Sequence, residues 1–267
     1  YIRPSVKGKL MVKLAANLSM MFNEVPFLDR FAEAAACGFK AVEYLFPYDF
    51  TPEEVAERLN AAGLEQALFN LPPGDWEKGE RGLSSLPGRE EEFMASLEKA
   101  LSYAKALNCP RLHVMAGMRQ HGANTETYVA NLKKAASRAA QDGVNLCIEP
   151  INQRDIPGFF LATTGQAIEV LDAVDEPNIG LQLDLYHLQI SEGDLAMRTR
   201  ALLDRVEHIQ IAGNPDRHEP DIGEVYYPFL FNLLDELGYQ GWIGCEYRPK
   251  GETKAGLSWA ADYGVSL

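Results

Sequence analysis

The chain has 267 residues, 46% hydrophobic and 24% charged, which is typical of a globular protein and long enough for one large domain. Its formal net charge of −13, with no dense cluster of Lys and Arg, argues against a nucleic-acid partner. No apolar run reaches the roughly 18 residues of a membrane-spanning helix, and four widely spaced cysteines indicate reduced thiols in a cytoplasmic protein.

The N-terminal residues differ in character from the rest of the chain. Residues 1–10 lack the apolar core of a signal peptide, and Met11 resembles a natural start. We therefore interpret residues 1–10 as an N-terminal extension or a cloning remnant, and residues 11–267 as a single domain.

Short β-rich segments alternate with amphipathic ones along the whole domain. Strands are predicted at KLAANLSM (13–20), AVEYLFP (41–47), EQALFNLP (65–72), RLHVMAG (111–117), NLCIEPI (145–151), IGLQLDLYH (179–187), VEHIQIAG (206–213) and GWIGCEY (241–247). Helices are predicted at residues 27–38, 51–63, 89–108, 125–143, 163–175, 194–205, 226–238 and 255–264. Eight such βα units in about 250 residues predict an α/β fold, the (β/α)8 TIM barrel. A doubly wound sheet usually has fewer strands and a GxGxxG after the first, which is absent here.

Local signals mark several helix ends. Thr51 to Glu54 form a capping box with proline at the first helical position. Glycines stand where four helices should stop, at positions 38, 63, 143 and 238. One long Gly- and Pro-rich connection, residues 72–88 with Trp76 and Arg81, is typical of a loop that closes over a binding site.

Oxygen-bearing side chains end the last four predicted strands, at Glu149, Asp184, Gln210 and Glu246. Because chemistry in a TIM barrel lies at the carboxyl ends of the strands, we expect these groups to converge. One layer below, the inward positions are Cys147, Gln182, His208 and Gly244. Converging carboxylates repel one another unless a cation offsets them, and an all-oxygen set favours Mg²⁺ or Mn²⁺ over Zn²⁺.

Three further residues are candidates for substrate binding. His187, just past the sixth strand, is suited to polarise a substrate oxygen, although a surface imidazole fits the sequence as well. Arg217, in the loop after the seventh strand, has the fork that binds carboxylates. Asn70 ends the third strand.

Other polar residues are expected to be structural. His208 and His113 are interpreted as buried interior residues rather than functional ones. Glu43 ends the second strand, and the sequence offers no partner for it.

Several long segments resemble the hydroxypyruvate isomerase family, which is one of the xylose isomerase-like TIM barrels. The most specific are ANLSMMF, VEYLFPYDF, NLPPGDWEKGERGL, LPGREEEF, IEPIN with DIPGF, HIQIAGNPDRHEPDIGEV and GWIGCEYRPKGET. The resemblance runs nearly end to end from Met11. It implies that Glu149, Asp184, Gln210 and Glu246 hold a divalent metal, and that Glu149 and Glu246 also act as acid and base.

The activity that the resemblance implies is the interconversion of hydroxypyruvate and 2-hydroxy-3-oxopropanoate, through an enediolate, in glyoxylate metabolism. His187 and Arg217 would then hold oxygens of the substrate. A 2-oxo-tetronate isomerase and a ketose 3-epimerase of the same barrel group remain alternatives, as does a non-catalytic barrel that binds sugar acids. The sequence leaves the native metal, the order of proton transfer and the oligomeric state open, homo-oligomers included.

Overall fold

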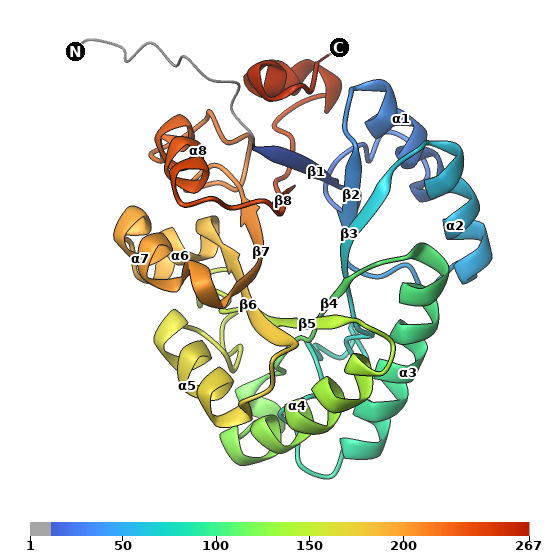
Figure 1. Cartoon of the computed structure of the whole chain (residues 1–267), viewed down its shortest axis with the longest axis vertical. Coiled ribbons are helices and arrows are strands. Elements are labelled where there is room, and N and C mark those ends of the chain that lie inside the picture. The colour runs from blue at the N-terminus through green and yellow to red at the C-terminus, as the bar shows by residue number, and fades with distance from the viewer. Residues whose placement is uncertain (1–11, 267) are drawn as a thin grey trace.

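The computed structural model describes residues 12–266 and shows a closed barrel of eight parallel strands inside a ring of helices (Figure 1). β1 (Lys13–Asn17) pairs with β2 (Ala41–Tyr44) on one side and with β8 (Trp242–Cys245) on the other, which closes the barrel. The prediction of a single TIM barrel is confirmed. The proposed extension at residues 1–10 lies outside the described residues.

The elements follow one another in simple chain order around the ring. The other strands are β3 (Glu65–Asn70), β4 (Arg111–His113), β5 (Asn145–Ile148), β6 (Ile179–Asp184) and β7 (Val206–Ile211). The helices are α1 (Arg30–Ala36), α2 (Pro52–Ala61), α3 (Glu90–Leu107), α4 (Thr125–Ala140), α5 (Thr164–Val174), α6 (Leu185–Ser191), α7 (Leu195–Leu202) and α8 (Tyr227–Glu236), followed by a 3₁₀ helix, Lys254–Tyr263.

The predicted helix ends agree with the structure. The Thr51 side chain accepts a hydrogen bond from the backbone N–H of Glu54, whose carboxylate accepts in return from the N–H of Thr51. The four predicted stop glycines all have positive φ, as glycines after a helix do: Gly38, Gly63, Gly143 and Gly238.

The sixth β-rich segment extends three residues beyond its strand, which ends at Asp184, the residue predicted to end it. The Asp184 carboxylate accepts hydrogen bonds from the backbone N–H groups of Tyr186 and His187 and so caps α6. The last three residues of the segment, 185–187, therefore form the first turn of a helix. This turn positions the His187 side chain at the carboxyl end of the barrel.

All eight strands end before their predicted β-rich segments do, and the difference is largest for β4, which ends at His113. Beyond His113, the loop at residues 72–88 takes up the hydrogen bonds of the chain. The Ser84 hydroxyl donates to the carbonyl of Met115, and the backbone N–H of Ser85 donates to that of Ala116. Gly82 has φ +113, and a Cβ there would lie 2.1 Å from the Met115 oxygen, so only glycine fits this approach. The loop is thereby attached to the carboxyl end of β4.

Polar side chains fill the middle of the barrel instead of the usual branched apolar ones. Glu43 is fully buried and accepts hydrogen bonds from Asn17 (2.9 Å) and Gln210 (2.8 Å), and His208 Nε2 contacts it at 2.6 Å. The expectation that Glu43 has no partner is wrong, because its partners come from strands far away in the sequence. His208 is buried as predicted.

Gly244 makes room for this carboxylate. A Cβ on Gly244 would lie 2.2 to 2.4 Å from the carboxyl atoms of Glu43, so the glycine faces inward, as predicted. Nearer the amino ends of the strands, Ala15, Ala41 and Ala67 form a small apolar cluster. The barrel therefore changes from apolar to polar along its axis.

Two expectations about the whole chain can be compared with the structure. All four cysteines are buried and unbridged, as expected of reduced thiols. Within residues 12–266, no helix has the length and apolar character needed to cross a membrane.

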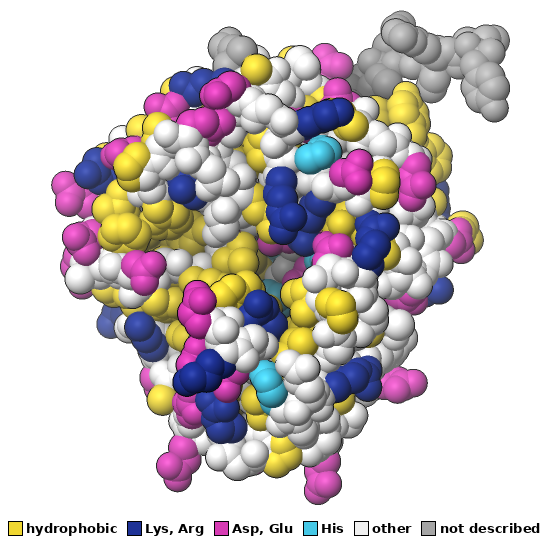
Figure 2. Space-filling model, turned by 180° about the vertical axis from the view of Figure 1, so that it is seen from behind, with side chains coloured by type: hydrophobic (Ala, Val, Ile, Leu, Met, Phe, Trp, Pro, Cys, Tyr) yellow, Lys and Arg dark blue, Asp and Glu magenta, His cyan; other side chains and the backbone are white. Residues whose placement is uncertain are grey.

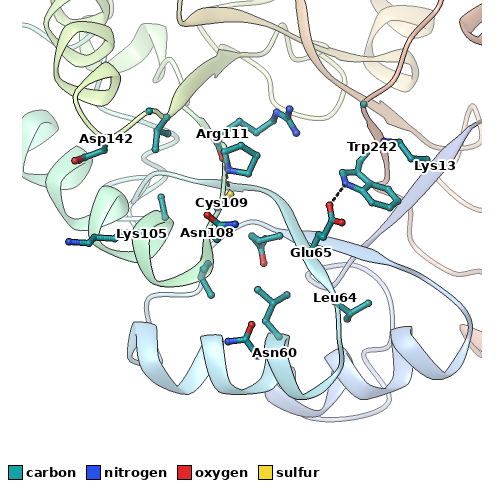
Figure 3. A pocket seen from close by; sticks show the side chains of 18 of the residues that line it. Lys13, Asn60, Leu64, Glu65, Lys105, Asn108, Cys109, Arg111, Asp142 and Trp242 are labelled. Carbon is teal, nitrogen blue, oxygen red and sulfur yellow. Dashed lines mark hydrogen bonds between the residues drawn. The ribbon is translucent and has the colours of Figure 1, made fainter.

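A cavity of about 860 Å³ lies at the amino ends of the strands, away from the predicted site. Its charged side chains are spread around the rim, with Lys105 and Asp142 on one side and Lys13 on the other (Figure 3). Asp142 is already paired with Arg138, and Glu65 accepts a hydrogen bond from Trp242. These groups do not converge on one point, so chemistry is not expected there.

Candidate active site

Four buried side chains meet at the carboxyl ends of the strands: Glu149 after β5, Asp184 at the end of β6, His187 in α6 and Glu246 after β8. Each offers one ligand atom, and these atoms all lie within 4.8 Å of one another. One face of the molecule is hollowed at its centre, with Lys and Arg side chains around the hollow (Figure 2). The convergence of three predicted carboxylates and His187 in the structure is the basis of the candidate site.

Arg217 forms the cationic wall of the site. Its Nη2 lies 2.5 Å from Glu246 Oε2 and 3.4 Å from Asp184 Oδ2, and its Nη1 lies 3.3 Å from Asp155. The guanidinium also packs on the ring of Tyr186. Arg217 is 8% exposed and thus already has three carboxylate partners. In this arrangement the Arg217 guanidinium holds the acidic side chains in place.

The electrostatics of the cluster are unfavourable without a further positive charge. Burial raises the pKa of Glu246 to about 8 against the opposing effect of Arg217. Burial likewise raises the pKa of Asp184 to about 6. Burial and the carboxylates of Glu246 and Asp184 raise the pKa of Glu149 well above its ordinary value. One arginine therefore does not balance three buried carboxylates.

Both histidines beside the cluster have lowered pKa values, which favour the neutral imidazole. Burial and the charge of Arg217 lower the pKa of His187 well below its ordinary value. Burial lowers the pKa of His113 to about 3. Nε2 of His113 lies 3.6 Å from Glu149 Oε2, so this residue contacts the site although the sequence indicated a core role.

Gln210 belongs to the hydrogen-bond network of Glu43 inside the barrel. Its Nε2 donates to Glu43, and its Oε1 accepts from Gln182 Nε2 at 2.6 Å. These two bonds set the orientation of the amide, and they leave one lone pair on Oε1. Its predicted role as a ligand stays a prediction.

The other predicted residue, Asn70, is 7% exposed at the end of β3, opposite His113 of β4. Three residues that sequence reasoning missed also contact the site: Asn17, Asn152 and Asp155. Asn17 ends β1, and Asn152 follows β5 in the segment IEPIN. A polar residue at the carboxyl end of a barrel strand indicates a site residue, so this signal could have identified both.

The donor set fits a divalent cation of the hard class. Oε1 of Glu149 is buried with no hydrogen-bond donor among the described residues, which leaves an oxygen ready for a ligand. The converging oxygens of Glu149, Asp184 and Glu246 suit Mg²⁺ or Mn²⁺.

Gly244→Ala is expected to disturb the Glu43 network, which lies inside the barrel beneath the site. The new methyl group would collide with the Glu43 carboxylate, which three side chains hold, so the free energy of unfolding should fall by about 1–3 kcal/mol. Urea unfolding measures this. Gly165→Ala in α5 is the control, because nothing lies within 4 Å of its Cβ and it should not destabilise. Wild-type stability of Gly244→Ala would show that the Glu43 network is loose.

Residues 31–263 match the model of the xylose isomerase-like TIM barrel family. The chain belongs to this family. It is 53% identical over 257 residues to a 2-oxo-tetronate isomerase of Cupriavidus necator, which covers 95% of this chain and 99% of that protein. It is 45% identical over 257 residues to a hydroxypyruvate isomerase of Escherichia coli, covering 95% and 100%.

Among solved structures of the family, one from Brucella melitensis, described as an AP endonuclease of family 2, matches with a TM-score of 0.92. That protein is 48% identical in sequence, and the match covers 94% of this chain and 99% of the other. At this level of identity the relatives share the family as well as the barrel.

Proposed function

We propose that this member of the xylose isomerase-like family is an isomerase that interconverts hydroxypyruvate and 2-hydroxy-3-oxopropanoate. The observation that carries the proposal is the buried cluster of Glu149, Asp184 and Glu246 with His187 at the carboxyl end of the barrel. Relatives that are 45 to 53% identical over nearly their whole length carry the names of hydroxypyruvate and 2-oxo-tetronate isomerases.

A divalent metal, Mg²⁺ or Mn²⁺, would be held by Glu149, Asp184, Gln210 and Glu246. When bound, it supplies Lewis-acid stabilisation of the negative charge that develops on two adjacent substrate oxygens. The unpartnered Oε1 of Glu149 and the excess of buried carboxylates support this assignment.

The two glutamates provide the proton transfers. One removes a proton from C3 of hydroxypyruvate, which leaves an enediolate, and the other delivers a proton to C2. The hydroxyl proton moves from O3 to O2, so C3 becomes the aldehyde and C2 the secondary alcohol. Glu149 and Glu246 follow different strands, β5 and β8, and so approach the substrate from different directions.

The surrounding residues orient the substrate. His187 donates a hydrogen bond to a substrate oxygen, and Asn70 is a further binding candidate. The Arg217 guanidinium contacts Glu246. Its predicted contact with the substrate carboxylate would use the same guanidinium group. The loop at residues 72–88 carries Arg81 stacked 3.5 Å over the Trp76 ring, and we propose that it excludes water during turnover.

The same chemistry serves a four-carbon acid, so 2-oxo-tetronate is the alternative substrate. The kcat/KM values for the two acids decide between them. The four unbridged cysteines support a reducing compartment such as the cytoplasm. Glyoxylate metabolism remains an expectation from the family.

Endonuclease activity is an alternative raised by the relative from Brucella melitensis, which is called an AP endonuclease. The net charge of −13 opposes binding to a phosphate backbone. Incubation with a duplex that contains an abasic site should therefore leave the strand intact.

Proton NMR of hydroxypyruvate in D₂O tests the proposal directly. With enzyme and Mg²⁺ or Mn²⁺, solvent deuterium should enter C3 of the substrate and the aldehyde product should accumulate. Tight binding without deuterium entry would instead favour a non-catalytic binding barrel. Free ketoses, which lack the carboxylate, should be turned over poorly, and efficient 3-epimerisation of them would contradict the assignment.

A further inference from the structure

The orientation of the Asn152 side chain is determined by the backbone around it. Its Oδ1 accepts hydrogen bonds from the backbone N–H groups of Arg154 (2.9 Å) and Asp155 (2.8 Å). A backbone N–H can only donate, so this end of the amide must be the oxygen. Asn152 is fully buried, and exchanging its oxygen and nitrogen would break both bonds.

This orientation determines which nitrogen of His187 carries the proton. The Nδ2 group of Asn152 lies 2.7 Å from His187 Nδ1, and an amide NH₂ can only donate. Nδ1 must therefore accept, with its lone pair toward Asn152. A neutral imidazole then carries its proton on Nε2. A second proton, on Nδ1, would point at the NH₂ group of Asn152, which is itself a donor.

Nε2 is the nitrogen that faces the acidic cluster. It lies 3.6 Å from Asp184 Oδ2 and 3.8 Å from Glu149 Oε1. A nitrogen at this position can act in one of two ways, and each excludes the other. With a lone pair it is a fourth metal ligand beside the three carboxylates, and with a proton it is a hydrogen-bond donor.

We propose that Asn152 is a positioning residue that holds His187 as an Nε2–H donor and thereby keeps its imidazole out of the metal's ligand set. Removing imidazole leaves an all-oxygen set, which disfavours Zn²⁺ relative to Mg²⁺ and Mn²⁺. The same proton is aimed at the place where a substrate oxygen binds, and this second consequence rests on the proposed isomerase function.

Nitrogen NMR of ¹⁵N-histidine-labelled protein tests the proposal without any substrate. In long-range ¹H–¹⁵N spectra of metal-free and Mg²⁺-loaded protein, His187 should show a protonated Nε2 and an unprotonated Nδ1. The His187→Gln variant identifies its signals by their loss. A protonated Nδ1 together with an unprotonated Nε2 in wild-type protein would overturn the proposal outright.

Asn152→Asp reverses the hydrogen bond with little change of shape. One carboxylate oxygen still accepts from the backbone N–H groups of Arg154 and Asp155, while the other accepts from His187. Nδ1 should therefore become protonated. The control is Asn124→Asp, the same exchange at the N-cap of α4, where the side chain accepts from the N–H of Thr127 and aspartate caps equally well. The control should leave the His187 signals unchanged.

Metal binding and kinetics supply two further readouts. In Asn152→Asp the ratio of Zn²⁺ to Mg²⁺ affinity, measured by calorimetry, should rise more than about tenfold, and kcat should fall by about 10- to 100-fold with a smaller change in KM. An unchanged His187 tautomer in Asn152→Asp would contradict the positioning role. If the tautomers behave as expected but no isomerisation occurs in wild-type protein, only the proposed function fails.

Discussion

Glu149→Gln and Glu246→Gln are each expected to lower kcat by about 10³-fold or more. General acid–base catalysis contributes on the order of 10² to 10⁴ in rate, and an amide can neither accept nor deliver the proton at carbon. Each exchange also removes a charged oxygen from the proposed ion site, which Asp184 completes. Initial rates with hydroxypyruvate, at saturating Mg²⁺ or Mn²⁺, measure the effect.

The fold should survive these exchanges. Both carboxylates are buried among like charges, so the neutral amide should leave the free energy of unfolding unchanged or raise it. Glu207→Gln is a matched control, because Glu207 lies in β7 and accepts a hydrogen bond from Asn145, which an amide oxygen also accepts. Its activity should stay near wild type. If either site variant kept most of its activity, the two-glutamate mechanism would be wrong.

Removal of divalent cations is the second change expected to have a large effect. Lewis-acid stabilisation is worth several kcal/mol, so rigorously metal-free protein should lose at least about 10² in kcat. Dialysis against EDTA followed by titration with Mg²⁺ or Mn²⁺ should restore the rate. Full activity in metal-free protein would remove the metal from the mechanism while leaving the acid–base pair possible.

Thermal unfolding separates metal binding from catalysis. A cation at about 100 times its Kd stabilises the folded protein by about 2.7 kcal/mol, so Tm should rise on its addition. In Glu149→Gln and Glu246→Gln this rise should largely disappear, since each variant loses a carboxylate of the cluster. An equal rise in both variants would place the ion elsewhere in the protein.

Much of the architecture could be predicted from local patterns. The alternation of strand and helix patterns, the capping box at Thr51 and the stop glycines each depend on a few neighbouring residues, and each agrees with the structure. The predicted β-rich segments run past the carboxyl ends of all the strands, and β4 and β6 show the physical reason most clearly. There the loop at residues 72–88 and the Asp184 cap end the strands early, through contacts that strand propensity does not contain.

Part of the candidate site could likewise be predicted from the sequence, and part could not. Strand ends in a parallel barrel share one face, so the meeting of Glu149, Asp184 and Glu246 could be expected from their positions in the sequence. The partners of Glu43 could not, because Asn17 and His208 reach it from strands 26 and 165 residues away. For the same reason the sequence did not reveal that Arg217 is held by three carboxylates.

By itself the sequence determined the barrel, the face on which the acidic groups gather and the family to which the chain is similar, because these follow from short-range periodicity and recurrent motifs. Only the tertiary structure decided which polar atoms face one another inside the barrel. Those pairings orient the amide of Gln210 and are the basis of the proposed proton position on His187, and they depend on contacts between residues that are distant in the chain.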